Sequence, residues 1–280
     1  MAARPLYSSV DQKPAYALRY TWSGWAVSGD LTQLAPDAWG ALTIAWEKDG
    51  LRLLERAVKP RELQLTFSTT PDISPVFLAT RAKGRLQHEL RTTLKTPVEF
   101  SRKLAVRAVG NNRTEIVEDY IESQVPKEQF VDSRFADFLK QFTIRNPAVD
   151  LSVPAASGSG RYWYNLHLAL VVDGRCRIVD EPGLIAIRDG CQRIAGKKGY
   201  EIALLSVMPD HLHLALRGNI EHSPSEIALA FQNNLAFQLN RGAVWMNGYY
   251  AGTFGEYDIQ AIRLQRDRSS SQCRAAGDPS

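Results

Sequence analysis

The sequence predicts an α+β protein of two ferredoxin-like (RRM-like) domains, each an antiparallel sheet with helices packed on one face. Two observations lead to this prediction: the chain repeats itself at a nearly constant offset, and strand and helix patterns alternate within each copy. The length of 280 residues agrees, because it suits two domains of about 100 to 150 residues each. No apolar run approaches the ~18 residues that span a bilayer, so we expect no membrane segment.

The repeat is defined by glycine, proline and serine positions that keep one register. Residues 50–67 resemble residues 199–216, and residues 100–110 resemble residues 245–255. Three pairs of landmarks are each 149 residues apart: Gly50 and Gly199, Pro60 and Pro209, and Ser74 and Ser223. We therefore divide the chain into a first copy at 14–126, a linker at 127–160 and a second copy at 161–268, packed together as an intramolecular pseudo-dimer.

The second copy shows the expected order of elements most clearly. The pattern predicts a strand at 162–172, a short strand at 175–179, a helix at 183–197, a strand at 201–217 and a helix at 223–240. The last helix follows the start signal Ser223-Pro224. The linker holds Asn146-Pro147, Val153-Pro154 and Ser157-Gly-Ser-Gly160, which predict a mixture of helix and flexible connection.

The strongest chemical signal is a histidine pair in the second copy. The sequence there reads Val207-Met-Pro-Asp-His211-Leu-His213-Leu-Ala-Leu216. Because residues two apart on a strand point to the same face, His211 and His213 converge while the intervening leucines enter the core. Two adjacent imidazoles on an otherwise apolar strand predict a site for a divalent metal.

Met208-Pro-Asp-His-Leu-His-Leu214 resembles the signature of single-tyrosine HUH transposases, the small enzymes of simple bacterial insertion sequences and their REP-associated relatives. In that family a helix carries a nucleophilic tyrosine and, four residues later, a glutamine that joins the metal. The first copy has such a helix, Thr114-Glu-Ile-Val-Glu-Asp-Tyr120-Ile-Glu-Ser-Gln124, and the spacing puts both residues on one helix face. The resemblance implies that His211, His213 and Gln124 hold Mg²⁺ or Mn²⁺, and that Tyr120 attacks single-stranded DNA to form a 5′-phosphotyrosine.

Each copy lacks one of the two motifs, the histidine pair or the tyrosine helix, that the other copy keeps. In the first copy the histidine positions are Glu62 and Gln64, and in the second the helix expected after Gly255 has no tyrosine near residues 264–265. The family resemblance implies composite sites, in which the tyrosine helix of one subunit reaches the histidine pair of the other. The chain is therefore expected to act as a monomeric pseudo-dimer with one complete site.

Positive charge is concentrated at residues 76–113, where nine Lys or Arg face two Glu. Such a segment is typical of a phosphate-binding surface, although a solvated helix face gives the same pattern. Our candidates for phosphate contacts are Lys83, Arg85, Arg102, Lys103 and Arg107, and Trp245 and Tyr249 are candidates for stacking on unpaired bases. We expect surface or packing roles for His88, His167 and His222.

The three cysteines, Cys176, Cys191 and Cys273, are an odd number without metal-type spacing. They predict neither a disulfide framework nor a zinc cluster. The first ten residues lack the apolar stretch of a secretory signal, so we expect a cytoplasmic protein with reduced thiols.

Three functions are compatible with these patterns. The first is a metal-dependent, transposase-like endonuclease or strand transferase that acts on single-stranded DNA at hairpins or palindromic repeats. The second is a catalytically silent, domesticated protein that still binds DNA hairpins. The third is a replication initiator or relaxase, which shares the histidine pair but usually arranges its strands in a different order. The intact Tyr120, Gln124 and histidine pair favour the first.

Overall fold

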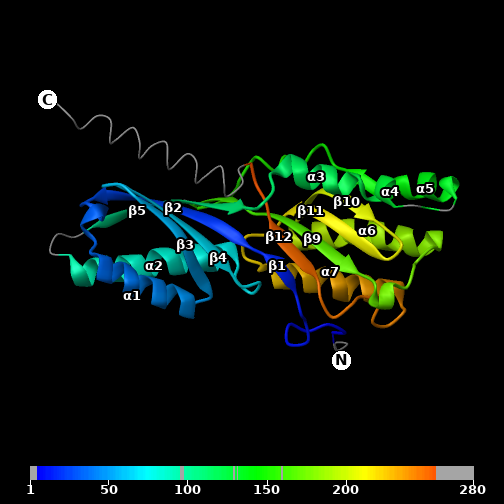
Figure 1. Ribbon diagram of the computed structural model, residues 1–280, viewed down its shortest axis with the longest axis horizontal. Coiled ribbons are helices and arrows are strands. Elements are labelled where there is room, and N and C mark those ends of the chain that lie inside the picture. Colours follow the sequence, from blue (N-terminus) through cyan, green and yellow to red (C-terminus); the bar gives the residue numbers. More distant parts are fainter. Residues whose placement is uncertain (1–4, 95–97, 129, 131, 159, 257–280) are drawn as a thin grey trace.

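The computed structural model describes residues 5–94, 98–128, 130, 132–158 and 160–256. Its strands form two six-stranded sheets that follow one another along the molecule (Figure 1). We call them the N-terminal sheet, with strand order β3-β4-β2-β5-β8-β7, and the C-terminal sheet, with strand order β1-β12-β9-β11-β10-β6. No helix in these described ranges is both long and apolar enough to cross a membrane.

The N-terminal sheet is covered by two helices on one face (Figure 1). Its strands are β2 (Arg19–Ser28), β3 (Leu51–Val58), β4 (Glu62–Thr69), β5 (Glu99–Val109), β7 (Ala155–Ser157) and β8 (Gly160–Trp163). Its helices are α1 (Pro36–Lys48) and α2 (Pro75–Thr93), and a 3-10 turn at Leu31–Gln33 leads into α1.

The C-terminal sheet carries helices on both faces (Figure 1). Its strands are β1 (Ala15–Ala17), β6 (Thr143–Arg145), β9 (Asn165–Val171), β10 (Glu201–Val207), β11 (His211–Arg217) and β12 (Tyr250–Thr253). Helices α6 (Glu181–Lys198) and α7 (Pro224–Leu239) cover one face, and α3 (Thr114–Glu122) packs on the other, against β10 and β11. The chain continues from α3 into α4 (Gln124–Lys127) and α5 (Ser133–Lys140).

Both sheets share one central topology. In chain order the elements are β2-α1-β3-β4-α2-β5 in one half and β9-α6-β10-β11-α7-β12 in the other. The central strands lie in the equivalent spatial orders β5-β2-β4-β3 and β12-β9-β11-β10. This is the ferredoxin-like βαββαβ arrangement, so the predicted α+β class is confirmed.

The two sheets exchange strands at their shared edge. β1, which precedes β2, pairs in parallel with β12, and β8, which precedes β9, pairs in parallel with β5. Gly110 and Gly255, equivalent in the repeat, lie where the sheets meet: a Cβ on Gly110 would come within 2.2 Å of the Thr253 carbonyl oxygen, and one on Gly255 within 2.6 Å of the Ala108 carbonyl oxygen. This close backbone approach requires glycine at both positions.

Helix starts follow the serine-proline signals of the repeat. Ser223 and Glu226 form a capping box, in which the Ser223 hydroxyl accepts from the Glu226 amide at 3.2 Å and the Glu226 carboxylate accepts from the Ser223 amide at 2.7 Å. The Ser74 hydroxyl accepts from the Phe77 amide at 3.2 Å at the start of α2. Both helices have proline in the first turn, where its missing N–H costs nothing.

Several sequence expectations differ from the structure. The short strand expected at 175–179 is wrong: the turn at Asp173 continues as a 3-10 turn through Arg175, with Gly174 at φ 58°, and no strand follows. The strand expected at 201–217 is two strands, because the loop 208–210 turns the chain back and β10 pairs antiparallel with β11. The segment 127–160 holds α5 and adds β6 to one sheet and β7 to the other. The helix expected after Gly255 lies outside the described residues.

The two cysteines within the described residues differ sharply in accessibility. Cys176 is exposed, whereas Cys191 is buried in α6, and burial raises the pKa of its thiol. Because the thiolate is the reactive form, we expect a maleimide to label one thiol in a native Cys273→Ser variant and two after denaturation, as read by mass spectrometry. Rapid labelling of Cys191 in the folded protein would contradict its burial.

Candidate active site

Strand β11 presents the histidine pair on the face of the C-terminal sheet opposite α6 and α7. Leu212 and Leu214 are fully buried in the main core, whereas His211 and His213 alternate with them on the other face. The centroids of the two imidazole rings are 5.0 Å apart. The two rings are therefore close enough to share a ligand.

Helix α3 brings Tyr120 onto this face. Val117 and Ile121 on the same helix pack with Leu204 and Ala215 of the sheet in a small second core. The Tyr120 ring lies edge-on to the His213 ring, with centroids 5.4 Å apart, and its side chain is 43% exposed. A helix from the first half of the chain thus meets a strand of the second, as the complementary losses in the repeat predict.

Gln124 lies one turn beyond Tyr120, in the short helix α4. It is 8% exposed, and its amide nitrogen donates a hydrogen bond of 2.6 Å to the Tyr120 carbonyl oxygen. The predicted adjacency of Tyr120 and Gln124 is present. Lys127, which the sequence did not single out, holds its ammonium group 4.7 Å from the centroid of the Tyr120 ring.

Each histidine of the pair has a partner at its Nδ1. The Asp210 carboxylate lies 2.7 Å from His211 Nδ1 and also accepts from Arg175 at 2.8 Å. Burial alone would raise the pKa of Asp210, but the hydrogen bonds from Arg175 and His211 lower it overall. Nε2 of His167 lies 3.0 Å from Nδ1 of His213. Burial lowers the pKa of His167 to about 4 and also lowers that of His213, which keeps both rings neutral at neutral pH.

His167 is the site residue that sequence reasoning missed. It lies on β9, with its ring centroid 5.1 Å from that of His213 and 5.8 Å from that of Tyr120. The signal was present in the alternation Leu166-His167-Leu168-Ala169-Leu170, which places a polar ring on the face opposite the core. His222, in contrast, packs against Tyr200, whose hydroxyl lies 3.0 Å from its Nδ1.

The donor set at this site is compatible with a divalent metal. Nδ1 of both His211 and His213 is engaged, so Nε2 is the nitrogen that each ring has left for a ligand. The engaged amide nitrogen of Gln124 leaves its oxygen as the donor atom. Within the described part of the chain, no three His, Cys, Asp or Glu side chains are grouped so that they could hold a metal ion.

The equivalent face of the N-terminal sheet lacks this chemistry. Glu62 and Gln64 occupy β4 at register positions opposite Trp25 and Ser23 of β2. Glu62 forms an ion pair with Lys59 at 3.2 Å. The structure therefore brings the histidine pair and Tyr120 together on the C-terminal sheet, with Gln124 one turn beyond Tyr120.

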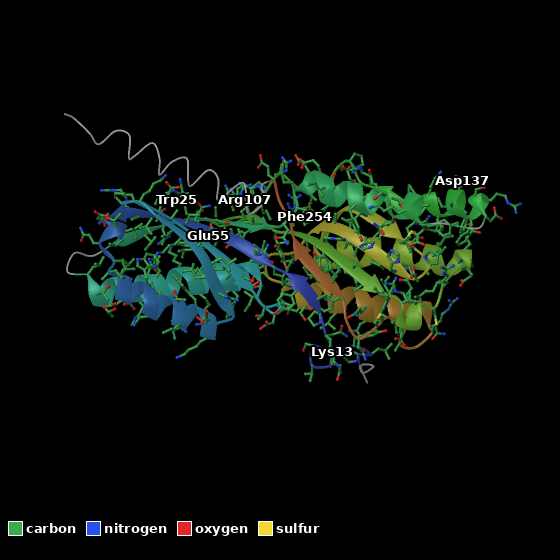
Figure 2. All side chains as sticks on the ribbon, viewed as in Figure 1. Lys13, Trp25, Glu55, Arg107, Asp137 and Phe254 are labelled. Atoms are coloured by element: carbon green, nitrogen blue, oxygen red, sulfur yellow. The ribbon has the colours of Figure 1, made fainter. Side chains whose placement is uncertain are left out.

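The five predicted phosphate contacts do not gather at Tyr120. Lys83 donates to the Ser101 carbonyl oxygen at 2.8 Å, and Arg85 forms a bidentate ion pair with Asp49, which places both in the helical layer of the N-terminal sheet. Arg102 and Lys103 are exposed at the start of β5. Of the five, only Arg107 lies near the sheet junction, the edge where the two sheets meet (Figure 2). Its guanidinium stacks 3.9 Å from the Trp163 ring centroid.

The prediction that Trp245 and Tyr249 stack on unpaired bases is wrong. Trp245 is 2% exposed and Tyr249 5%, so neither ring is open to an unpaired base. Trp245 belongs to the main core, and its backbone amide donates to the Tyr7 hydroxyl at 2.6 Å. The aromatic residue that does reach the site is Tyr250, one position further on, whose ring centroid is 5.3 Å from that of His167.

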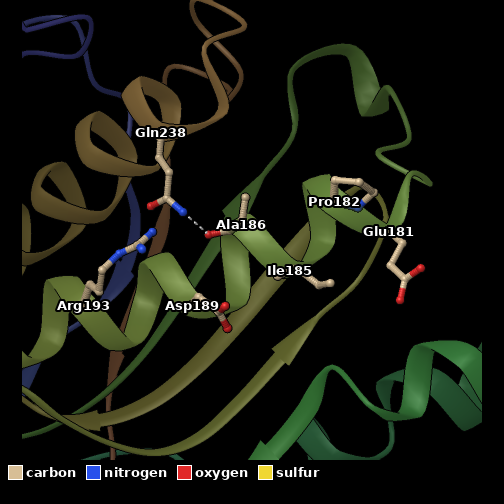
Figure 3. Close-up of a pocket in the computed structure, with 7 residues that line it drawn as sticks. All are labelled: Glu181, Pro182, Ile185, Ala186, Asp189, Arg193 and Gln238. Carbon is tan, nitrogen blue, oxygen red and sulfur yellow. Dashed lines mark hydrogen bonds between the residues drawn. The ribbon is translucent and has the colours of Figure 1, made fainter.

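Two pockets lie outside the histidine cluster. The first is between α6 and α7, on the opposite side of the C-terminal sheet from α3 (Figure 3), where the Gln238 amide donates to the Ala186 carbonyl oxygen at 2.6 Å. The second is at the sheet junction, lined by Arg107 and Trp163 on one side and by Glu115 and Glu118 of α3 on the other. Neither is lined by His211, His213 or Tyr120.

Helix α3 offers a matched test of its docking. Ile121 is fully buried on the face of α3 that packs on the sheet, whereas Ile116 on the same helix is 48% exposed. Ile121→Ala is expected to lower the free energy of unfolding by about 2 kcal/mol, the low end for such truncations because the second core is small. Ile116→Ala should change it by less than about 0.5 kcal/mol. Denaturant titration measures both, and equal effects would show that α3 is not held by this contact.

The fold and this site together define a ferredoxin-like protein with a helix-borne tyrosine above a strand-borne histidine pair. The family model described as "Transposase IS200 like" matches residues 161–264, which agrees with the resemblance that the histidine signature carries. No curated protein matches the chain.

Three solved structures align with parts of the chain. A Deinococcus radiodurans protein proposed to be a transposase is 22% identical, with 39% of this chain and 88% of that one covered, at a TM-score of 0.31. A REP-associated tyrosine transposase bound to a REP hairpin is 11% identical, with 36% and 61% covered, at 0.31. The ligand-free regulatory subunit of aspartate kinase from Thermus thermophilus is 9% identical, with 78% and 97% covered, at 0.20. Likenesses at this level carry no conclusion about function.

Proposed function

We propose that this chain is a metal-dependent endonuclease and strand transferase for single-stranded DNA, with Tyr120 as the nucleophile. The proposed metal ligands are His211, His213 and Gln124, and the proposed metal is Mg²⁺ or Mn²⁺. The observation that carries the proposal is the 5.4 Å contact between the Tyr120 and His213 rings, made across 93 residues of chain. The IS200-like transposase match to the second half of the chain supports the same chemistry.

In the proposed reaction the Tyr120 oxygen attacks the scissile phosphorus. A new phosphorus–oxygen bond forms to the phenol, the bond to the 3′ oxygen breaks, and the products are a 5′-phosphotyrosine and a 3′-hydroxyl. The phenol proton leaves to solvent, which reaches Tyr120 because its side chain is partly exposed, and water protonates the leaving 3′ oxygen. A bound divalent ion supplies charge stabilisation at the scissile phosphate. The Lys127 ammonium beside the Tyr120 ring is placed to attract the phosphate.

The proposed enzyme has one complete site per chain. On the N-terminal sheet Glu62 and Gln64 stand where the histidines would be, Glu62 pairs with Lys59, and α3 with Tyr120 packs on the C-terminal sheet instead. The chain therefore acts as a pseudo-dimer of two ferredoxin-like halves, the surviving site being shared between them. The proposed substrate is a hairpin or palindromic end with an unpaired strand next to it, and the proposed phosphate contacts on the N-terminal sheet are Arg107 and the exposed Arg102 and Lys103.

Purified protein mixed with Mn²⁺ and a hairpin oligonucleotide carrying a single-stranded flank tests the proposal. We expect a protein–DNA adduct that survives denaturing electrophoresis and disappears when EDTA removes the metal. A label at the 3′ end of the oligonucleotide, downstream of the cut, should remain with the protein, because the downstream fragment stays bonded to the phenol through its 5′ phosphate. Tight binding of the hairpin without any adduct, in Mn²⁺ or Mg²⁺, would instead identify the chain as a silent hairpin-binding protein.

A further inference from the structure

His167 lies between three functional groups on the open face of the C-terminal sheet. Its register partner on β11 is Ala215, and the partner of His213 on β9 is Ala169, so the two histidines are diagonal neighbours across the strand pair. The alanines at the other two corners leave room for the imidazoles to meet edge to edge. The resulting distance, 3.0 Å between His167 Nε2 and His213 Nδ1, is that of a hydrogen bond.

The other side of His167 is closed by Tyr250. Gly252 is the register partner of His167 on β12, and a Cβ there would lie 2.4 Å from the Tyr250 hydroxyl oxygen. The Tyr250 ring therefore lies over Gly252 and meets His167 edge-on, with centroids 5.3 Å apart. Tyr120 adds a second edge-on contact, with ring centroids 5.8 Å apart. With rings on three sides, His167 has little freedom to rotate away from His213.

We propose that His167 is a positioning residue that accepts the Nδ1 proton of His213 and so keeps the His213 Nε2 lone pair free to bind a metal. A neutral imidazole carries its proton on one nitrogen only, and the hydrogen bond at one nitrogen decides which. The reverse arrangement, with His167 donating, would leave a proton on His213 Nε2 and block coordination. Asp210 performs the same task for His211, where its carboxylate accepts at Nδ1.

This inference rests on the proposed metal site and adds to it a different orienting group for each ligand. Asp210 is a carboxylate that also pairs with Arg175, whereas His167 is a second imidazole in a nearly closed ring cluster. The ion pair with Arg175 holds Asp210 in place, whereas the surrounding rings hold His167 in place. Loss of the Asp210 carboxylate should therefore weaken metal binding through His211, and loss of the His167 imidazole should weaken it through His213.

Three variants separate the hydrogen bond from simple packing. In His167→Gln the side-chain amide oxygen can stand where Nε2 stands and still accept from His213. In His167→Leu the volume is kept but no acceptor remains. His88→Gln changes a histidine on α2, in the other half of the molecule, and controls for general effects of the substitution.

The first measurement is the tautomer of His213 in the metal-free protein, by nitrogen-15 NMR of histidine-labelled samples. We expect the Nδ1–H form in the wild type and in His167→Gln, and a mixture in His167→Leu. The second is calorimetric titration with Mn²⁺, in which His167→Leu should bind about 10- to 100-fold more weakly. His167→Gln should stay within about threefold of the wild type, and His88→Gln should match it.

An Nε2–H tautomer of His213 in the wild type would overturn the inference. So would wild-type Mn²⁺ affinity in His167→Leu, or equal weakening in the Gln and Leu variants when both fold normally. These readouts need no DNA. If the wild type bound Mn²⁺ as expected but formed no adduct with the hairpin oligonucleotide, the proposed nuclease function would fail while the role of His167 stood.

Discussion

Tyr120→Phe is expected to abolish the covalent DNA adduct, with strand cleavage reduced at least about 10³-fold, because the phenol oxygen is the atom that bonds to phosphorus. Folding should be unaffected, since the hydroxyl lies on a side chain that is 43% exposed and the ring contacts with His213 and His167 remain. The measurement is denaturing electrophoresis of the labelled hairpin oligonucleotide with Mn²⁺, together with thermal unfolding of both proteins.

The stringent control for this experiment is Tyr250→Phe. Tyr250 also lies against His167, and it is the second phenol of the same ring cluster. It comes from β12 rather than from the helix that follows the family pattern, so its variant should keep the adduct. An adduct that persisted in Tyr120→Phe and vanished in Tyr250→Phe would move the nucleophile from one ring to the other.

Gly110→Ala is expected to lower the free energy of unfolding by about 3 kcal/mol or more, since overpacking against rigid backbone is costly. The added Cβ would stand 2.2 Å from the Thr253 carbonyl oxygen, and neither group can rotate away because both belong to the backbone of the sheet junction. Gly255→Ala, with the equivalent contact at 2.6 Å to the Ala108 carbonyl oxygen, should behave similarly. Urea titration followed by circular dichroism measures the change.

A matched glycine is available within the same half of the chain. Gly84 lies in α2, and a Cβ there would meet nothing within 4 Å. Gly84→Ala should therefore be neutral or stabilise the protein by about 0.5–1 kcal/mol, because alanine favours helix. A Gly110→Ala variant as stable as Gly84→Ala would mean that the junction opens easily, and then α3 would not be held over the histidine pair.

The junction of the two sheets also explains why α3, which follows β5, lies on the C-terminal sheet. β5 leads through Gly110 to Arg113, which bridges to Gly255, and the Thr114 amide donates to the Gly255 carbonyl oxygen at 3.0 Å. From there α3 can only run onto the C-terminal sheet. Arg145 on β6 then forms ion pairs with Glu118 at 2.7 Å and Glu122 at 2.8 Å, which raise the pKa of its guanidinium and tie the helix to the sheet edge.

The sequence by itself determined the features that depend on local periodicity. The constant offset of the repeat predicted two equivalent ferredoxin-like topologies, because each strand and helix is specified by its own pattern of apolar residues. Ser223 marked a helix start through capping chemistry that acts within three residues. The alternation around His211 and His213 predicted their shared face, since side-chain direction on a strand has a period of two.

Only the tertiary structure decided which residues of separate strands and helices meet at the site. His167 joins the site through strand register, which pairs β9 with β11 and cannot be read from either strand alone. Tyr250 lies at the site whereas its neighbour Tyr249 is buried in the core, because β12 pairs with β9 in one register and a shift of one residue reverses the direction of every side chain. The phosphate candidates scatter for the same reason: charge in one stretch of sequence is divided between the helical layer and the sheet once the chain folds. Such contacts depend on long-range packing, which no window of sequence contains.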